Sequence, residues 1–126
     1  MSDLRHPVAI ARGLGSAKDG TGHWWNQRVT AVALALLSPW FVFFVVGLTG
    51  ADQATVQAAI AAPVNATLLI AFVLALFWHA RLGLQVVVQD YVHGWAEIAL
   101  QLAIKFACAL AAIVSVIAIG CIVFSA

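Results

Sequence analysis

Apolar residues along this chain gather in three long runs, at about residues 29–48, 64–89 and 98–124. Each run reaches the roughly 20 residues that an α-helix needs to cross about 30 Å of hydrocarbon. None of the runs shows the two-residue alternation of a membrane β-strand. Because a segment in lipid must form its backbone hydrogen bonds internally, each run is predicted to be a helix. The pattern predicts an all-α integral membrane protein whose three transmembrane helices lie within residues 29–126.

Composition agrees with the bilayer as the solvent, since 64% of the 126 residues are hydrophobic and only 9% are charged, unlike the usual soluble domain. Residues 1–28 are the only long polar stretch, and the glycines within it predict an irregular N-terminal arm. No small-residue cleavage site follows the first run, so we expect that helix to be retained. The formal net charge of +1 gives no support for nucleic-acid binding.

The distribution of basic residues predicts how the helices cross the membrane. Four of the six basic residues precede the first run, whereas the connection at 49–63 contains none. Since basic residues collect on the cytoplasmic side, we expect a cytoplasmic arm, a cytoplasmic connection at 90–97 and a periplasmic C-terminus. Small residues are frequent in all three runs and let further helices approach closely. We therefore expect the three helices to form part of a larger bundle.

The two cysteines, Cys108 and Cys121, both lie in the third run, 13 positions apart. That separation along one helix is too long for a disulfide, and no CxxC or CxxH spacing indicates a metal site. We interpret both as small apolar residues. The tryptophans near the predicted cytoplasmic boundary suit an interfacial aromatic belt, and they are Trp24, Trp25 and Trp95.

His79 is the most informative polar residue, because it lies about ten residues from the end of the second run, deep in the apolar sequence. A buried imidazole needs a partner, and two interpretations stand: a hydrogen bond to a neighbouring helix, or ligation of a haem. At 100° per residue, Gly83, Val86 and Asp90 fall on the same stripe as His79. Gly83 would let a flat macrocycle or another backbone approach. No other histidine is as deep, so a second axial ligand would come from another subunit.

Three cations and a tyrosine complete the candidates. Arg81 lies about 200° around the helix from His79, so it faces a different neighbour and either snorkels or pairs with another subunit. Lys105, about eight residues into the third run, is expected to extend toward headgroups. Arg28 could bind lipid phosphate or a haem propionate. Tyr91, a phenol beside Asp90 at the end of the second run, can donate a hydrogen bond.

The segments HWWNQRVTA before the first run and HARLGLQVVVQDYVH in the second, with three spans in about 125 residues, resemble the family of succinate dehydrogenase hydrophobic membrane anchors. The family pattern is matched by His79, Gly83, Asp90 and Tyr91. The resemblance implies that His79 is one axial ligand of haem b, that Tyr91 holds ubiquinone, and that Arg28 lies near the haem propionates and the quinone. The same role is implied more weakly for His23. Asp90 would orient the phenol or relay protons, and Gly83 would leave room for haem.

The resemblance also implies an assembly in the bacterial inner membrane, a mitochondrial inner membrane being the alternative. A flavoprotein subunit oxidises succinate, an iron–sulfur subunit passes the electrons on, and this chain with a cytochrome b subunit binds haem b and completes the ubiquinone pocket. This chain would then carry no catalytic residue of the dehydrogenase. The alternatives are a fumarate reductase anchor working in the opposite direction, a small transporter with a polar path at His79 and Arg81, and an anchor without cofactor.

Overall fold

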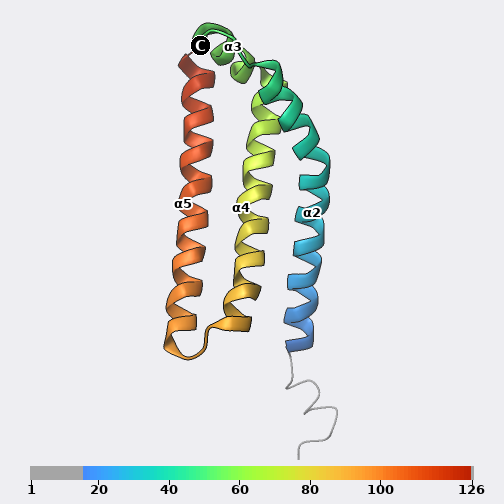
Figure 1. The fold of residues 1–126 in the computed structure, drawn as a ribbon, viewed down its shortest axis with the longest axis vertical. Coiled ribbons are helices and arrows are strands. Elements are labelled where there is room, and N and C mark those ends of the chain that lie inside the picture. The colour runs from blue at the N-terminus through green and yellow to red at the C-terminus, as the bar shows by residue number, and fades with distance from the viewer. Residues whose placement is uncertain (1–15, 126) are drawn as a thin grey trace, which may run out of the picture.

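The computed structural model describes residues 16–125, with side chains described from residue 21 onward. The first fifteen residues of the predicted arm lie outside this range. The elements of the described chain are helices: α2 (Ser16–Gly47), α3 (Gln53–Ala61), α4 (Pro63–Tyr91) and α5 (Trp95–Ser125) (Figure 1). Helices α2, α4 and α5 contain the apolar spans, which lie at Thr21–Gly47, Pro63–Tyr91 and Trp95–Ser125. The prediction of three helices long and apolar enough to cross a membrane is confirmed.

The N-terminal boundary of the first helix differs from the prediction. We expected an irregular arm up to residue 28, but α2 is already helical from Ser16 and continues through Gly20 and Gly22. Hydropathy indicates where a helix enters the hydrocarbon core. The backbone hydrogen bonds of the helix can continue beyond that point into the interface, as long as no proline interrupts them. The turns that precede the apolar run therefore carry His23 and Arg28 on a regular helix.

A short helix, α3, occupies most of the connection that was expected to be a loop. Asp52 caps its N-terminus, where a carboxylate oxygen accepts a hydrogen bond from the Thr55 backbone N–H at 3.2 Å. Pro63 then starts α4, a position where the missing N–H costs nothing. The Asn65 side chain donates to the Ala59 backbone oxygen at 2.8 Å and so ties α4 back to α3.

The three long helices form a single layer with α4 between α2 and α5 (Figure 1). Residues 92–94 join α4 to α5 in a tight turn that Gly94 makes possible with its positive φ of 77°. We call this end of the layer, where α2 also begins, the hairpin end. Near the opposite end, α2 bends toward α4 in Figure 1, and Pro39 lies inside α2 where it removes one helical hydrogen bond.

Helix α4 is the core of the layer. All four buried hydrophobic residues of the described chain lie on it, namely Ala66, Leu69, Leu82 and Val88. Phe41 of α2 stacks on Phe72 of α4 with ring centroids 4.4 Å apart. The outer faces of α2 and α5 expose most of their large apolar side chains, which in an aqueous protein would mark a large interaction surface. Lipid and partner helices are the environment that such faces require.

Candidate functional site

His79 and Thr30 meet at the contact between α4 and α2. The Thr30 hydroxyl oxygen lies 3.0 Å from His79 Nδ1, and both residues are half-buried. The deep imidazole predicted from the sequence to need a partner therefore has one within the same chain. This is the contact expected from the interpretation of His79 as a residue bonded to a neighbouring helix. The contact involves only one of the two ring nitrogens.

The hydrogen bonds of the Thr30 hydroxyl favour one tautomer of His79. Thr30 Oγ1 lies 2.9 Å from the backbone oxygen of Asn26 and 3.1 Å from that of Gln27. These carbonyls can only accept, so the single hydroxyl hydrogen is directed to them and Thr30 accepts from His79 Nδ1–H. In this tautomer Nε2 keeps its lone pair. No hydrogen bond of Nε2 is found in the described part of the chain, so this lone pair is unused there.

One turn toward the hairpin end from His79, a cleft of about 680 Å³ opens between α2 and α4. Its lining is mostly polar on α2 and small or polar on α4, and consists of His23, Trp24, Gln27, Arg28, Gly83, Gln85, Val86 and Gln89. Three residues predicted from the sequence, His23, Arg28 and Gly83, are thus brought together here. His79 does not line this cleft itself but lies on the same stripe of α4, next to it.

Two atoms beside this cleft are buried and lack a hydrogen-bond partner within the described residues: His23 Nε2 and Gln27 Oε1. Buried polar atoms are normally paired, because an unpaired one costs about 1–3 kcal/mol in lost solvation. Gln27 also lies across from Gly83, where a Cβ would stand 3.7 Å from its Nε2. Two residues that line the cleft, His23 and Gln27, therefore each carry a buried polar atom that the described chain leaves unpaired.

Arg28 supplies the positive charge of the cleft. Its guanidinium carbon lies 5.2 Å from the centroid of the Trp24 ring, a cation–π contact that holds the side chain over the first turns of the span. Arg28 is otherwise exposed, and it has no ion pair within the part of the chain that the structure describes. An anionic group such as a carboxylate or a phosphate fits this position.

Asp90 and Tyr91 end α4 at the hairpin end, outside the cleft. Both are exposed, and Tyr91 keeps 81% of its surface accessible. Both stand at the end of the second apolar span, and no other residue of the described chain encloses them. The described residues therefore leave the Tyr91 phenol open.

Residues 16–125 contain no group of three or more histidine, cysteine or acidic side chains that could hold a metal ion by themselves. Cys108 and Cys121 are free, as expected. Thr30 and Gln27, the α2 residues that contact His79 and Gly83, were not predicted from the sequence. The signal available in the sequence was a pair of polar residues, three positions apart, at the start of an apolar run. Residues at this spacing lie on the same face of a helix.

The chain is similar to known membrane anchors over most of its length. The sequence pattern of the family described as succinate dehydrogenase/fumarate reductase transmembrane subunit matches residues 2–119. The succinate dehydrogenase hydrophobic membrane anchor subunit of Rickettsia bellii is 37% identical over 90 residues, which cover 71% of this chain and 72% of the relative. That of Paracoccus denitrificans is 36% identical over 88 residues, with coverages of 70% and 68%. No solved structure matches the chain.

These similarities agree with the fold and with the resemblance found in the sequence. The family match includes His23, Arg28, His79 and Tyr91 within its bounds, and the all-helical layer with three apolar spans suits an anchor. The chain therefore belongs to the succinate dehydrogenase/fumarate reductase transmembrane subunit family, as a membrane anchor subunit of succinate dehydrogenase.

Proposed function

We propose that this anchor serves electron transfer from succinate to ubiquinone by supplying His79 as one axial ligand of haem b and Tyr91 to a quinone site. The observation that carries the haem assignment is the hydrogen bond between Thr30 and His79 Nδ1. Metal-ligating histidines donate their second ring N–H to a fixed acceptor, which sets the tautomer and the ring orientation. Thr30 is such an acceptor, and Nε2 is the nitrogen left for the iron.

The residues around His79 fit a haem edge. Haem propionates are carboxylates, and the cleft beside His79 holds the Arg28 guanidinium and the unpaired buried His23 Nε2. Because Gly83 has no side chain, it adds no bulk to the α4 side of this cleft. Haem b, when bound, provides a one-electron redox centre. Arg28 would offset the propionate charge, while Thr30 would hold the imidazole ring in place.

The second axial ligand belongs to another subunit in this proposal. His23 lies seven residues before Thr30 on α2, about 10 Å along the helix, and His93 lies beyond the end of α4. Neither is positioned across from His79. We assign the second ligand to the cytochrome b anchor subunit, and the large exposed apolar faces of α2 and α5 leave room for helices of that subunit.

The quinone role falls to the end of α4. Tyr91 can donate its phenolic hydrogen to a quinone carbonyl, where negative charge develops on reduction. Asp90, next to it, would orient the phenol or pass on a proton. Because both side chains are exposed in the isolated chain, we assign the remaining walls to the partner anchor, the cytochrome b subunit. The flavoprotein subunit oxidises succinate and does not contact this chain's site.

The membrane setting of the proposal is the bacterial inner membrane with the hairpin end on the cytoplasmic side. The basic residues before the first span and the bacterial relatives support it. The direction of the reaction, succinate oxidation rather than fumarate reduction, is supported by the names of the relatives, which are succinate dehydrogenase subunits.

Optical and EPR spectra of membranes containing the assembled complex test the haem ligand directly. His79→Ala removes the nitrogen and should abolish or strongly reduce the haem b signal. His93→Ala is the matched control, because His93 is an exposed histidine of the same chain outside the apolar spans, and it should leave the spectrum unchanged. Antibody detection of the partner subunits reports whether each variant still assembles.

Two outcomes would count against the proposal. A normal haem b spectrum in assembled His79→Ala complexes would mean that His79 is not an axial ligand of the haem. A purified wild-type complex with flavin and iron–sulfur centres but no haem would identify the chain as an anchor without cofactor. A His79→Ala complex that retains haem but shows altered quinone kinetics would link His79 to the quinone site and not to the haem iron.

A further inference from the structure

Arg81 of α4 and Lys105 of α5 stand opposite each other in the groove between these helices. Arg81 lies ten residues before Tyr91, and Lys105 lies ten residues after Trp95, so both are about 15 Å from the hairpin end. From the sequence alone they were expected to be two separate cations. The tight turn at residues 92–94 fixes the antiparallel register that brings them to the same depth.

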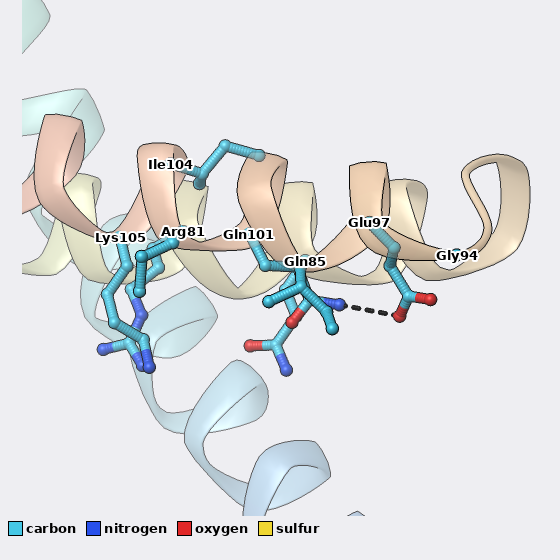
Figure 2. A pocket seen from close by; sticks show the side chains of 9 residues that line it. Arg81, Gln85, Gly94, Glu97, Gln101, Ile104 and Lys105 are labelled. Carbon is cyan, nitrogen blue, oxygen red and sulfur yellow. Dashed lines mark hydrogen bonds between the residues drawn. The ribbon is translucent and has the colours of Figure 1, made fainter.

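Both cations line one pocket of about 540 Å³ between α4 and α5, and Figure 2 shows their side chains leaving the two helices on the same side. Toward the hairpin end the pocket is lined by two amides, Gln85 and Gln101, and by Glu97. Donors and positive charge therefore dominate the deeper end. The pocket lies on the side of α4 away from the Thr30–His79 contact, as the 200° between Arg81 and His79 requires.

Neither cation has an ion pair within residues 21–125. The one acid of the pocket, Glu97, accepts a hydrogen bond from Gln101 Nε2 at 3.0 Å (Figure 2). It precedes Lys105 by eight residues, about 12 Å along α5, too far for a contact. Two positive charges that line one pocket of a membrane-spanning layer repel one another, and an anion from outside the chain would offset that repulsion.

A second groove begins at the same two cations and runs toward the middle of the layer. It has a volume of about 200 Å³ and is otherwise lined by apolar or small residues: Leu74, Phe77, Trp78, Cys108, Ala109 and Ala112. Arg81 and Lys105 thus stand at the junction of a polar pocket and an apolar groove. A ligand that fills both must carry an anionic group next to a hydrocarbon chain.

We propose that the α4–α5 groove binds an anionic membrane phospholipid, with its phosphate between Arg81 and Lys105 and an acyl chain along the groove beside Trp78 and Ala109. Phosphate oxygens accept charge-assisted hydrogen bonds from both cations. The α4 helix, at 29 residues, is about 43 Å long and exceeds a 30 Å hydrocarbon core. The cations therefore lie only about 8 Å inside the hydrocarbon if the helix is centred, within reach of a phosphate through their long stems.

Native mass spectrometry of the intact complex, extracted from its membrane in mild detergent, tests this assignment by counting bound phospholipids. The double variant Arg81→Gln/Lys105→Gln removes both charges and should lose one phospholipid per copy of this chain. The exchanged variant Arg81→Lys/Lys105→Arg keeps both charges and should retain it. The haem b spectrum should stay unchanged in both, which separates this result from the proposed function.

Titration of the delipidated complex with single phospholipids measures the headgroup selectivity of the α4–α5 groove. Phosphatidylglycerol should bind at least about tenfold more weakly to either single variant, Arg81→Gln or Lys105→Gln, than to wild type, as expected for one charge-assisted hydrogen bond. Phosphatidylcholine, which carries its own cation, should bind more weakly than phosphatidylglycerol. Ala109→Leu, which fills the apolar groove without changing charge, should also reduce retention.

Several results would overturn the proposal. The same phospholipid count in the double variant would place the lipid elsewhere. Displacement by inorganic phosphate at equal concentration would identify a small-anion site. Loss of a partner subunit without loss of lipid would show that a carboxylate of that subunit pairs with the cations. Recovery of a quinone in place of the phospholipid would identify a quinone pocket.

Discussion

The hydroxyl oxygen of Thr30 lies 3.0 Å from Nδ1 of His79, and this hydrogen bond joins the first apolar span to the second at the depth of the proposed haem ligand. The backbone carbonyls of Asn26 and Gln27 direct the hydroxyl hydrogen away from the ring. Thr30 is therefore placed to act through His79 as a positioning residue, holding the imidazole in the tautomer that leaves Nε2 free.

Replacement of Thr30 by valine tests this relationship. Valine keeps the branched shape and removes the acceptor, so we expect haem affinity to fall about 10- to 100-fold and the haem midpoint potential to shift. Thr30→Ser is the matched control, because it keeps the hydroxyl and should restore the wild-type potential. Redox titration of the haem absorption band measures both variants. Identical potentials for valine and serine would show that the hydroxyl does not act on the iron through His79.

Gly83 gives a size-dependent test of the cleft beside His79. A Cβ at this position would stand 3.7 Å from Gln27 Nε2, an ordinary contact, so Gly83→Ala should keep full haem content and gain up to about 1 kcal/mol of helix stability. Gly83→Leu would project into the space between α2 and α4 and should lower haem content.

The ratio of haem to flavin in purified complexes measures the effect at Gly83. Full occupancy in the leucine variant would mean that the haem edge does not approach this part of α4. A loss already in the alanine variant would mean that the macrocycle contacts the α4 backbone more closely than the cleft in the isolated chain indicates.

The three spans followed from the sequence because hydrocarbon imposes both the length and the apolar composition of a helix. The extent of α2 before residue 29 did not, because polar turns outside the hydrocarbon carry no such constraint. The short helix α3 was missed although Asp52 and Pro63 mark its start and the start of the next helix. A nine-residue helix has too few turns for a clear periodicity.

The candidate site was predictable only along one helix at a time. The stripe that joins His79 to Gly83 follows from 100° per residue and agrees with their placement along α4. Which α2 residues meet that stripe depends on helix packing, so Thr30 and Gln27 could not be assigned from α4 alone. The same holds for Arg81 and Lys105, whose common depth depends on a three-residue turn at residues 92–94.

Asp52 gives a pH-dependent prediction outside the spans. Hydrogen bonds from the Thr55 side chain and backbone N–H lower the pKa of the Asp52 carboxyl below its ordinary value. A lowered pKa means that the capped state of α3 is fully stabilised above the ordinary carboxyl pKa and loses this contribution as pH falls through the lowered value. Protection of the Thr55 amide from hydrogen exchange, relative to its intrinsic rate, should therefore decrease in acid.

The matched variant for this cap is Asp52→Asn, since asparagine also caps helices but does not titrate in this range. Its Thr55 amide should remain protected across the same pH interval. If wild type and Asp52→Asn lose protection together, the acid effect originates elsewhere in the chain.

Tyr91 allows the quinone site to be tested separately from the haem. Its ring is exposed at the end of α4 and packs on no core residue, so Tyr91→Phe should leave the assembly of the complex and the haem b spectrum intact. If the phenol donates a hydrogen bond to a quinone carbonyl that gains charge on reduction, its removal should lower kcat/KM for quinone by roughly tenfold. Electron transfer from succinate to an artificial acceptor that bypasses the quinone should be unaffected. Wild-type quinone kinetics in Tyr91→Phe would exclude a direct hydrogen bond from the phenol and make the neighbouring Asp90 the next side chain to test.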